Sequence, residues 1–524
     1  MTSLDHQKPK DLMNSKYKNL LIAILTMLSL AAIALTADAQ LAYNHSTHSK
    51  TTYRVNNVTG EFDVEYDGKI ELSDDDRDIV SISPGGYFEL EKSSFGASRK
   101  IKIESDGDGL SKHYFVGWSE RDYEPEGRKW LAEVLPELVR TTTIAAEARV
   151  NRIYQKGGTS ALIKELTLLN SDYVSDKYFE LTFEKPLSDQ DQAAVLKVAG
   201  ETVSSDHYLS QILSNYLKKY GVSSATVNNF IMAAGEISSD HYKTNVLLDV
   251  MKSSQIKEAQ LTQLIAASND IGSDHYKSNL LMEVLKRKDL NSSQLNEVLN
   301  QASDIGSDHY LSNVLMEIIK TQELSTANVT NIIRATNDIG SDHYKTNVFD
   351  QLFSHASLSN SDFKLVLNSV SEVNSDHYLQ QTLTKLLDKP LNEDVVVEIL
   401  KVATSSMNSD HYLTEVINKA MSDQKLTGRV MDEVALAIGS INSAHYATEI
   451  IKSASRKDLS KSQVMALLRA VSDINSDHYF TESLVALSDQ VNDMDDEVKD
   501  AYRAAAKNIS SDTYYGKAMK ALDY

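Results

Sequence analysis

The sequence contains no cysteine, little proline and fewer basic than acidic residues. Because none of its 524 residues is Cys, neither a disulfide nor a cysteine-ligated metal site can form. Of the 6 Pro, only Pro390 lies beyond residue 186, so long series of uninterrupted helices are easy to accommodate. The formal charge of −21 argues against a nucleic-acid partner, because binding to phosphates requires clustered Lys and Arg.

Recognisable catalytic motifs are absent as well. The chain has no His-Glu-x-x-His, no Gly-x-Ser-x-Gly and no phosphate-binding glycine loop. We therefore expect no cofactor and no metal ion. The sequence gives no positive evidence for an enzyme.

The first 40 residues have the pattern of an export signal. A basic segment with Lys16 and Lys18 precedes an apolar stretch over residues 20–35, and Ala37-Asp38-Ala39 follows. This order predicts a secretory signal peptide over residues 1–39. The alternative is an uncleaved transmembrane anchor, since the stretch is nearly long enough to span a bilayer. Both place the chain in the periplasm or outside the cell, with membrane contact only through this segment.

A small β-rich module is expected after a polar tether at residues 40–50. Within residues 51–124, apolar side chains recur at every second position, as in Phe62, Val64 and Tyr66, and Asp67-Gly68 is a turn sequence. Alternation with such turns predicts antiparallel hairpins. So small a sheet should need adjacent helices as a lid.

Two acidic clusters in this module have two possible interpretations. They are Asp74-Asp75-Asp76-Arg77-Asp78 and Asp106-Gly107-Asp108-Gly109. Calcium favours several oxygens close together, but neither cluster has the spaced ligands and closing Glu of an EF-hand. Solvated hairpin turns are therefore the favoured interpretation.

Helical periodicity begins near Gly127. Apolar residues recur at three and four positions from Trp130 to Val139, and Pro136 predicts a kink or a break into two short helices. We expect residues 125–174 to form an irregular helical entry to the repeats that follow.

The dominant feature is a repeat that contains Ser-Asp-His-Tyr. The Asp position falls at Asp206, Asp240, Asp274, Asp308, Asp342, Asp376, Asp410, Ala444 and Asp477. Seven of these eight intervals are 34 residues and the last is 33. Weaker copies start at Ser175-Asp176 and Ser511-Asp512. A period of this length predicts stacked helix pairs.

One copy illustrates the expected unit. Ser307 should cap a first helix that runs to about Lys320, with Asp308 in its first turn. Ser325 should cap a second helix, and Gly340 should end the unit. We expect the Tyr of each copy to pack in the repeat core with its hydroxyl outward, and the residue after Tyr to be exposed.

A polar column accompanies the His residues. Four positions after His every full copy has an amide or an acid, although Asn is a poor residue for a helix interior. The predicted candidate site is a ladder of these pairs: His207, Gln211, His241, Asn245, His275, Asn279, His309, Asn313, His343, Asn347, His377, Gln381, His411 and Glu415.

Three roles for this ladder remain open. It can hold the repeats in register, or it can line a surface that grips an extended ligand. A metal array is the third, but stacked helices lie roughly 10 Å apart, so consecutive His residues cannot share one ion. A response to pH is a further possibility, because His side chains generally gain a proton as pH falls through about 6.5.

The sequence also resembles a known bacterial region. Trp130-Leu131, Leu135-Pro136, Arg149-Val150 and Gly157-Gly158, followed by the Ser-Asp-x-Tyr repeats, are similar to the extracytoplasmic C-terminal region of membrane metallopeptidases of the β-lactam-sensor, antirepressor type. The peptidase domain and its zinc motif are absent, so no catalytic residue carries over. The resemblance implies an envelope-facing recognition part without the enzyme.

Together these patterns predict a mainly α protein, an α-solenoid of about ten two-helix repeats over residues 175–524, preceded by a small antiparallel β module. The expected function is a non-catalytic scaffold for a protein or peptide partner in the bacterial cell envelope. One alternative is a sensory or accessory subunit of an envelope signalling or peptidase system. The other is an enzyme with its site where the β module meets the helices.

Overall fold

The computed structural model describes residues 45–47, 50–57, 60–94, 97–106, 109–252, 256–288, 290–356 and 358–522. The predicted export signal lies outside these ranges. Within them, no helix is both long and apolar enough to cross a membrane. The chain divides into two compact units, Met1–Tyr242 and Lys243–Tyr524, each with its own packing.

The first unit begins with an antiparallel sheet in the order β1-β2-β3-β6-β7-β8-β9 and a separate β4–β5 hairpin. The strands are β1 (His45–Thr47), β2 (Lys50–Asn57), β3 (Gly60–Asp67), β4 (Ile70–Leu72), β5 (Ile79–Ile82), β6 (Tyr87–Ser94), β7 (Ala97–Ser105), β8 (Leu110–Val116) and β9 (Ser119–Arg121). The expected tether therefore contains structure, because β1 pairs with β2.

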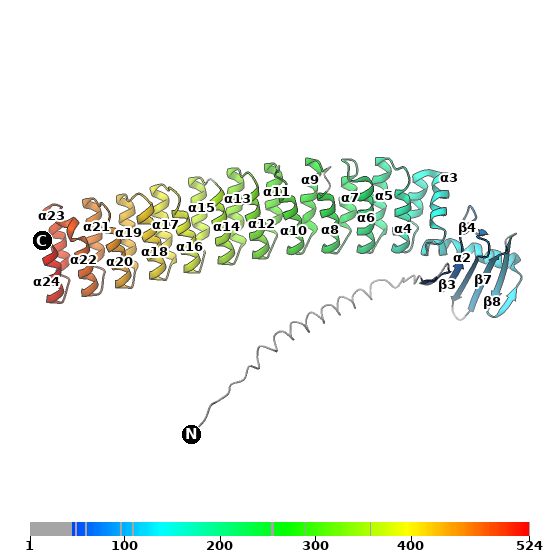
Figure 1. Cartoon of the computed structure of the whole chain (residues 1–524), viewed down its shortest axis with the longest axis horizontal. Helices are drawn as coiled ribbons and strands as arrows, with labels where there is room; N and C mark the ends of the chain where they lie inside the picture. The colour runs from blue at the N-terminus through cyan, green and yellow to red at the C-terminus, as the bar shows by residue number, and fades with distance from the viewer. Residues whose placement is uncertain are drawn as a thin grey trace, which may run out of the picture. The chain divides into compact units, whose positions relative to one another are not determined.

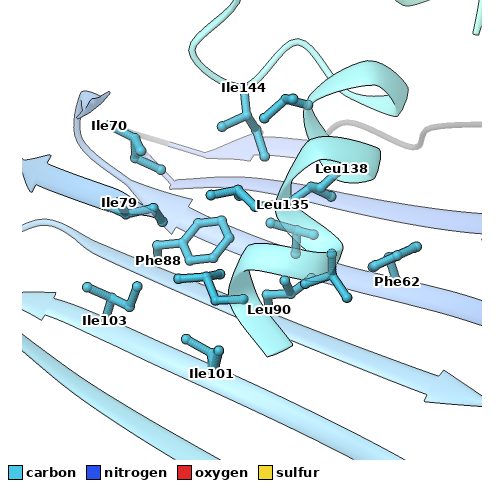
Figure 2. Packing of buried hydrophobic residues seen from close by; sticks show 14 of the residues in the cluster. Phe62, Ile70, Ile79, Phe88, Leu90, Ile101, Ile103, Leu135, Leu138 and Ile144 are labelled. Carbon is cyan, nitrogen blue, oxygen red and sulfur yellow. The ribbon is translucent and has the colours of Figure 1, made fainter. Parts of the chain in front are cut away.

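One face of the sheet forms the core of this module. Val64 lies opposite Leu90, and Leu90 lies opposite Ile101, so alternate side chains gather on one buried face. Helix α2 (Arg128–Thr141) covers this face with Leu135 and Leu138 (Figure 2). The predicted helical lid is confirmed. The predicted break at Pro136 is wrong, because α2 continues through it as one helix.

A buried ionic cluster joins the β4–β5 turn to the helices. Arg149 of α3 (Ala146–Leu166), 1% exposed, donates from Nε to Asp76 Oδ2 at 2.7 Å and from Nη2 to Glu165 Oε1 at 2.7 Å. Its Nη1 donates to the Tyr178 hydroxyl at 2.8 Å. The first acidic cluster forms the β4–β5 hairpin turn, and Asp74 and Asp75 are exposed in it as predicted. Asp76 differs, because it pairs with a buried cation. In the second cluster, residues 107–108 lie outside the described residues.

The helical repeats confirm the predicted fold class (Figure 1). In the described residues, ten helix pairs follow in chain order, and α24 (Asp512–Leu522) comes last. The first helices are α4 (Asp172–Phe183), α6 (Asp206–Tyr220), α8 (Asp240–Met251), α10 (Asp274–Leu285), α12 (Asp308–Thr321), α14 (Asp342–His355), α16 (Asp376–Leu387), α18 (Asp410–Asp423), α20 (Ala444–Ala454) and α22 (Asp477–Asn492). The second helices are α5 (Asp189–Thr202), α7 (Val227–Gly235), α9 (Glu258–Ala266), α11 (Ser292–Ser303), α13 (Thr326–Ala335), α15 (Asn360–Val370), α17 (Glu393–Ser406), α19 (Gly428–Ser440), α21 (Lys461–Val471) and α23 (Asp496–Ala506).

The Asp of each first helix has a partner in the next repeat. Asp308 Oδ1 and Oδ2 accept the backbone N–H groups of Gly340 and Ser341 at 3.0 and 2.8 Å. Ser307 stands at the helix N-cap as predicted, but its side chain makes no capping hydrogen bond. Equivalent contacts to the following repeat come from Asp172, Asp206, Asp274, Asp342, Asp376, Asp410 and Asp477.

These contacts also correct the first weak copy. Asp172, not Asp176, accepts from the Ser205 N–H at 2.7 Å, so the copy starts at Ser171-Asp172. Asp176 is half-buried, and burial raises its pKa.

The structure contradicts the prediction at two positions of the first helices, Tyr and the residue after it. The residue after Tyr is buried rather than exposed, as with Leu311 at 0% and Lys277 at 6%. Lys277 keeps its ammonium near a carboxylate, with Nζ 3.7 Å from Asp304 Oδ2, while its stem is buried. The Tyr rings are only half-buried, so the prediction that they pack in the core is wrong.

Replacing Asp308 with Ala should destabilise the contact between two repeats by about 1–3 kcal/mol, because two backbone N–H groups lose their charged acceptor. Hydrogen exchange at Gly340 and Ser341 should accelerate, and the urea midpoint should fall. Asp500→Ala, which removes a surface carboxylate 73% exposed, is the control. Unchanged exchange at both amides in Asp308→Ala would show that the carboxylate does not hold the loop.

Replacing Arg149 with Met should cost about 3 kcal/mol, because Asp76 and Glu165 would each lose one of two cationic partners and keep only Arg152 and Arg140. The matched control is Arg54→Met, whose pair with Asp63 is 63% and 45% exposed and should contribute little to stability because solvent screens it. Tryptophan fluorescence during denaturation reports on this unit, because both Trp residues lie in it. Equal midpoints for the two variants would contradict a stabilising role for the cluster.

Candidate functional site

The first helices of the second unit carry a continuous series of aromatic contacts on their exposed side. Each His ring contacts the Tyr of its own repeat, with centroids 5.0–5.3 Å apart. It also contacts the Tyr of the next repeat at 5.5–5.8 Å. We name these rings the His–Tyr ladder: Tyr276, His275, Tyr310, His309, Tyr344, His343, Tyr378, His377, Tyr412, His411, Tyr446, His445, Tyr479, His478 and Tyr514.

The first unit repeats this contact on a smaller scale. His207 lies 5.2 Å from Tyr208 and 5.9 Å from Tyr242, centroid to centroid. His241 lies 5.3 Å from Tyr242. Tyr173 stands in the place of the His and contacts Tyr208 at 6.3 Å.

The ring geometry determines what the ladder can offer to a ligand. Ring planes in the second unit are inclined by 45–61°, the tilted arrangement that aromatic pairs prefer. From Tyr310 onward to Tyr479, each Tyr contacts two His rings. The His side chains remain accessible, with His411 and His478 53% and 47% exposed. The ladder therefore presents His side chains to a ligand.

The predicted pairing of His with an amide four residues later occurs in three consecutive repeats. Nδ2 of Asn279, Asn313 and Asn347 lies 3.2, 3.2 and 3.3 Å from Nε2 of the preceding His. A side-chain amide nitrogen donates hydrogen bonds, so Nε2 of each His is the acceptor in these pairs. The Asn carbonyl oxygen and the second amide hydrogen stay available to a ligand.

The remaining predicted pairs differ from one another. His411 and Glu415 lie 3.6 Å apart, as do His478 and Glu482. Gln381 donates instead to Asp350 Oδ2 at 3.4 Å, on the preceding first helix. In the first unit Gln211 is exposed and makes no hydrogen bond with His207 among the described contacts. Asn245 is exposed on α8.

Two carboxylates on this side of the helices have shifted pKa values. The hydrogen bond from Lys452, at 2.8 Å, lowers the pKa of Glu482. Burial raises the pKa of Asp350, whose Oδ1 has no hydrogen-bond partner among the described residues. Asp350 is therefore a partly buried carboxylate beside the ladder, and only its Oδ2 accepts a hydrogen bond among the described residues.

Sequence reasoning missed a groove beside the ladder. It has a volume of about 510 Å³ and lies between α10 and α12, where Met282 and Met316 stand next to Asn279 and Asn313. One feature of the sequence could have indicated this groove. Met occurs eight residues after the Asp in two consecutive copies, at Met282 and Met316.

A second hollow lies in the first unit, where the sheet meets the helices. It measures about 580 Å³, and its lining includes Tyr66, Lys69, Thr143, Glu147 and Lys177. No His contributes to this lining. Across the described residues, no group of three His, Asp or Glu side chains is placed to hold one metal ion.

No family model and no curated protein matches the chain. Among known structures it is similar to the RNA-binding domain of yeast Puf5p bound to SMX2 RNA, at 14% identity over 64% of this chain and 96% of that one, with a TM-score of 0.31. It is also similar to the pentatricopeptide repeat protein PPR10 from maize, at 13% identity over 76% and 67% of the two chains, with a TM-score of 0.25. A model of the AP-3 complex gives 10% identity over 74% and 84%, with a TM-score of 0.28. Likenesses this weak assign no family.

Replacing Asp350 with Asn should raise the thermal midpoint at pH 7. Burial raises the folded-state pKa above the unfolded value of about 3.9, so the ionised form opposes folding at higher pH. The advantage of the variant should shrink as pH falls through the folded-state pKa and vanish below about 3.9. Asp338→Asn, at an exposed position, is the control. A lower midpoint for Asp350→Asn at pH 7 would contradict this account.

Proposed function

We propose that this chain is a non-catalytic binding scaffold of the bacterial cell envelope, and that it holds an extended polypeptide along the His–Tyr ladder. The proposal depends on one observation: the same polar side chains recur in every full copy although they are accessible to solvent. Elsewhere the copies differ at exposed positions, yet His, and an amide or acid four residues later, recur on one accessible side in every full copy.

The chemistry of the column favours a polypeptide backbone. A carboxamide offers one acceptor and two donors, which matches the C=O and N–H groups that an extended chain presents. The repeat distance also fits, since stacked helices lie roughly 10 Å apart and an extended chain advances about 3.3 Å per residue. Three peptide residues would therefore pass each repeat.

Two other ligand classes fit less well. Nucleobases bind by stacking on open aromatic faces, whereas the Tyr rings from Tyr310 to Tyr479 each contact two His rings already. Phosphate-rich polymers are also opposed by the net charge of −21. The polypeptide proposal therefore agrees with both the ring geometry and the charge.

The envelope location belongs to the same proposal. It is supported by the export-signal pattern of residues 1–39 and by the resemblance to the extracytoplasmic part of membrane metallopeptidases. A sensory or accessory subunit of such a system would use the same surface. A catalytic role at the sheet–helix hollow has weaker support, because its lining includes Glu147 as its one carboxylate and no His to act as a partner.

A peptide array tests the scaffold function. Purified protein is applied to random extended dodecapeptides, and wild type is compared with the triple variant Asn279→Ala, Asn313→Ala, Asn347→Ala. Loss of three amides should weaken binding about tenfold or more. The matched control replaces three exposed Asn residues of the second helices and their ends by Ala: Asn300, Asn337 and Asn368.

Circular dichroism must show that both triple variants remain folded. If the variant without Asn279, Asn313 and Asn347 then binds the array as strongly as wild type does, these amides have a structural role and the proposed function is wrong.

A further inference from the structure

The groove beside the ladder has a mixed polar and apolar lining. His275, Asn279, Tyr310 and Asn313 form its ladder side. Ser278, Met282, Met316, Glu317, Lys320 and Gln351 complete the lining. Asn279 and Asn313, which the proposed function assigns to a peptide backbone, thus lie in one wall of this groove beside the ladder rings of His275 and Tyr310.

The groove coincides with a local change in the repeat. Met282 and Met316 occupy the position eight residues after the Asp in two consecutive copies. In the next four copies this position is polar: Asp350, Thr384, Asn418 and Lys452. Two adjacent thioether side chains therefore make an apolar floor beside the amide column of α10 and α12.

Methionine side chains suit an adaptable apolar subsite. Met is unbranched and polarizable, so it fits apolar groups of different shapes. Typical small-ligand pockets occupy about 300–1,000 Å³, and this groove of about 510 Å³ has room for one large side chain. Glu317 and Lys320 of α12 add one charge of each sign to the lining.

We propose that this groove is the anchor subsite of the ladder. It takes one large apolar side chain, such as Leu, Met or Phe, from an extended polypeptide whose backbone contacts Asn279 and Asn313. The partner peptide carries no net negative charge, because a chain of −21 repels acidic partners. This inference rests on the proposed function and adds to it a preference for peptides with a large apolar side chain.

The test uses dodecapeptide arrays in which each position is varied in turn through Leu, Phe, Ser and Glu. Wild type should prefer Leu or Phe at one position of the peptide. In the double variant Met282→Gln, Met316→Gln this preference should disappear, with binding about tenfold weaker. Met316→Leu should retain it, since the floor remains apolar.

Met232→Gln is the matched control. Met232 is 67% exposed on α7 and lies outside the groove, so this variant should bind as wild type does. If the Asn triple variant loses binding but the Met double variant keeps the full apolar preference, the anchor subsite is wrong and the scaffold function stands. If neither variant changes binding to the arrays, the proposed function fails together with the subsite.

Discussion

The repeats depend on one carboxylate that each first helix offers to its neighbour. In most copies the Asp accepts backbone N–H groups at the start of the next first helix, as Asp376 does from Asn408 and Ser409. A charged acceptor shared by two donors fixes both distance and orientation. Within each unit, first helices joined in this way start at the same level, so the His of one comes to lie beside the Tyr of the next. The ladder follows from this alignment.

One copy lacks this carboxylate, and its first helix is still aligned with the next one. Ala444 stands in the place of Asp, and the interval to the next copy shortens to 33 residues. The next N-cap, Ser476, has φ −157°, compared with −84° at Ser443, and its N–H donates to Ile474 O at 3.0 Å. His445 still lies 5.8 Å from Tyr479. Buried apolar contacts therefore keep the ladder aligned where the carboxylate is missing.

The sequence predicted the helix pairs and their limits well, because periodicity and capping are local properties. The first helix expected from Ser307 to about Lys320 corresponds to α12, and Ser325 caps α13 with Asn328 as its partner. The wrong prediction for Tyr and the residue after it arose from amphipathic side chains. Tyr is compatible with a surface, and Lys277 buries its stem, so hydrophobicity alone placed the wrong residue in the core.

Contacts between distant residues could not be predicted in the same way. Asp76 and Arg149 are 73 positions apart, and nothing in either local sequence indicates the pair. The groove at Met282 and Met316 likewise requires two helices to stack in a particular register. The role of the His and amide column as a binding surface remains a prediction.

The most direct measurement is a crystal structure of the protein with the dodecapeptide that binds most tightly from the array. An extended peptide should lie along the first helices, with its backbone hydrogen-bonded to Asn279 and Asn313. A peptide bound on the second helices or in the hollow between sheet and helices, with the ladder uncovered, would contradict it.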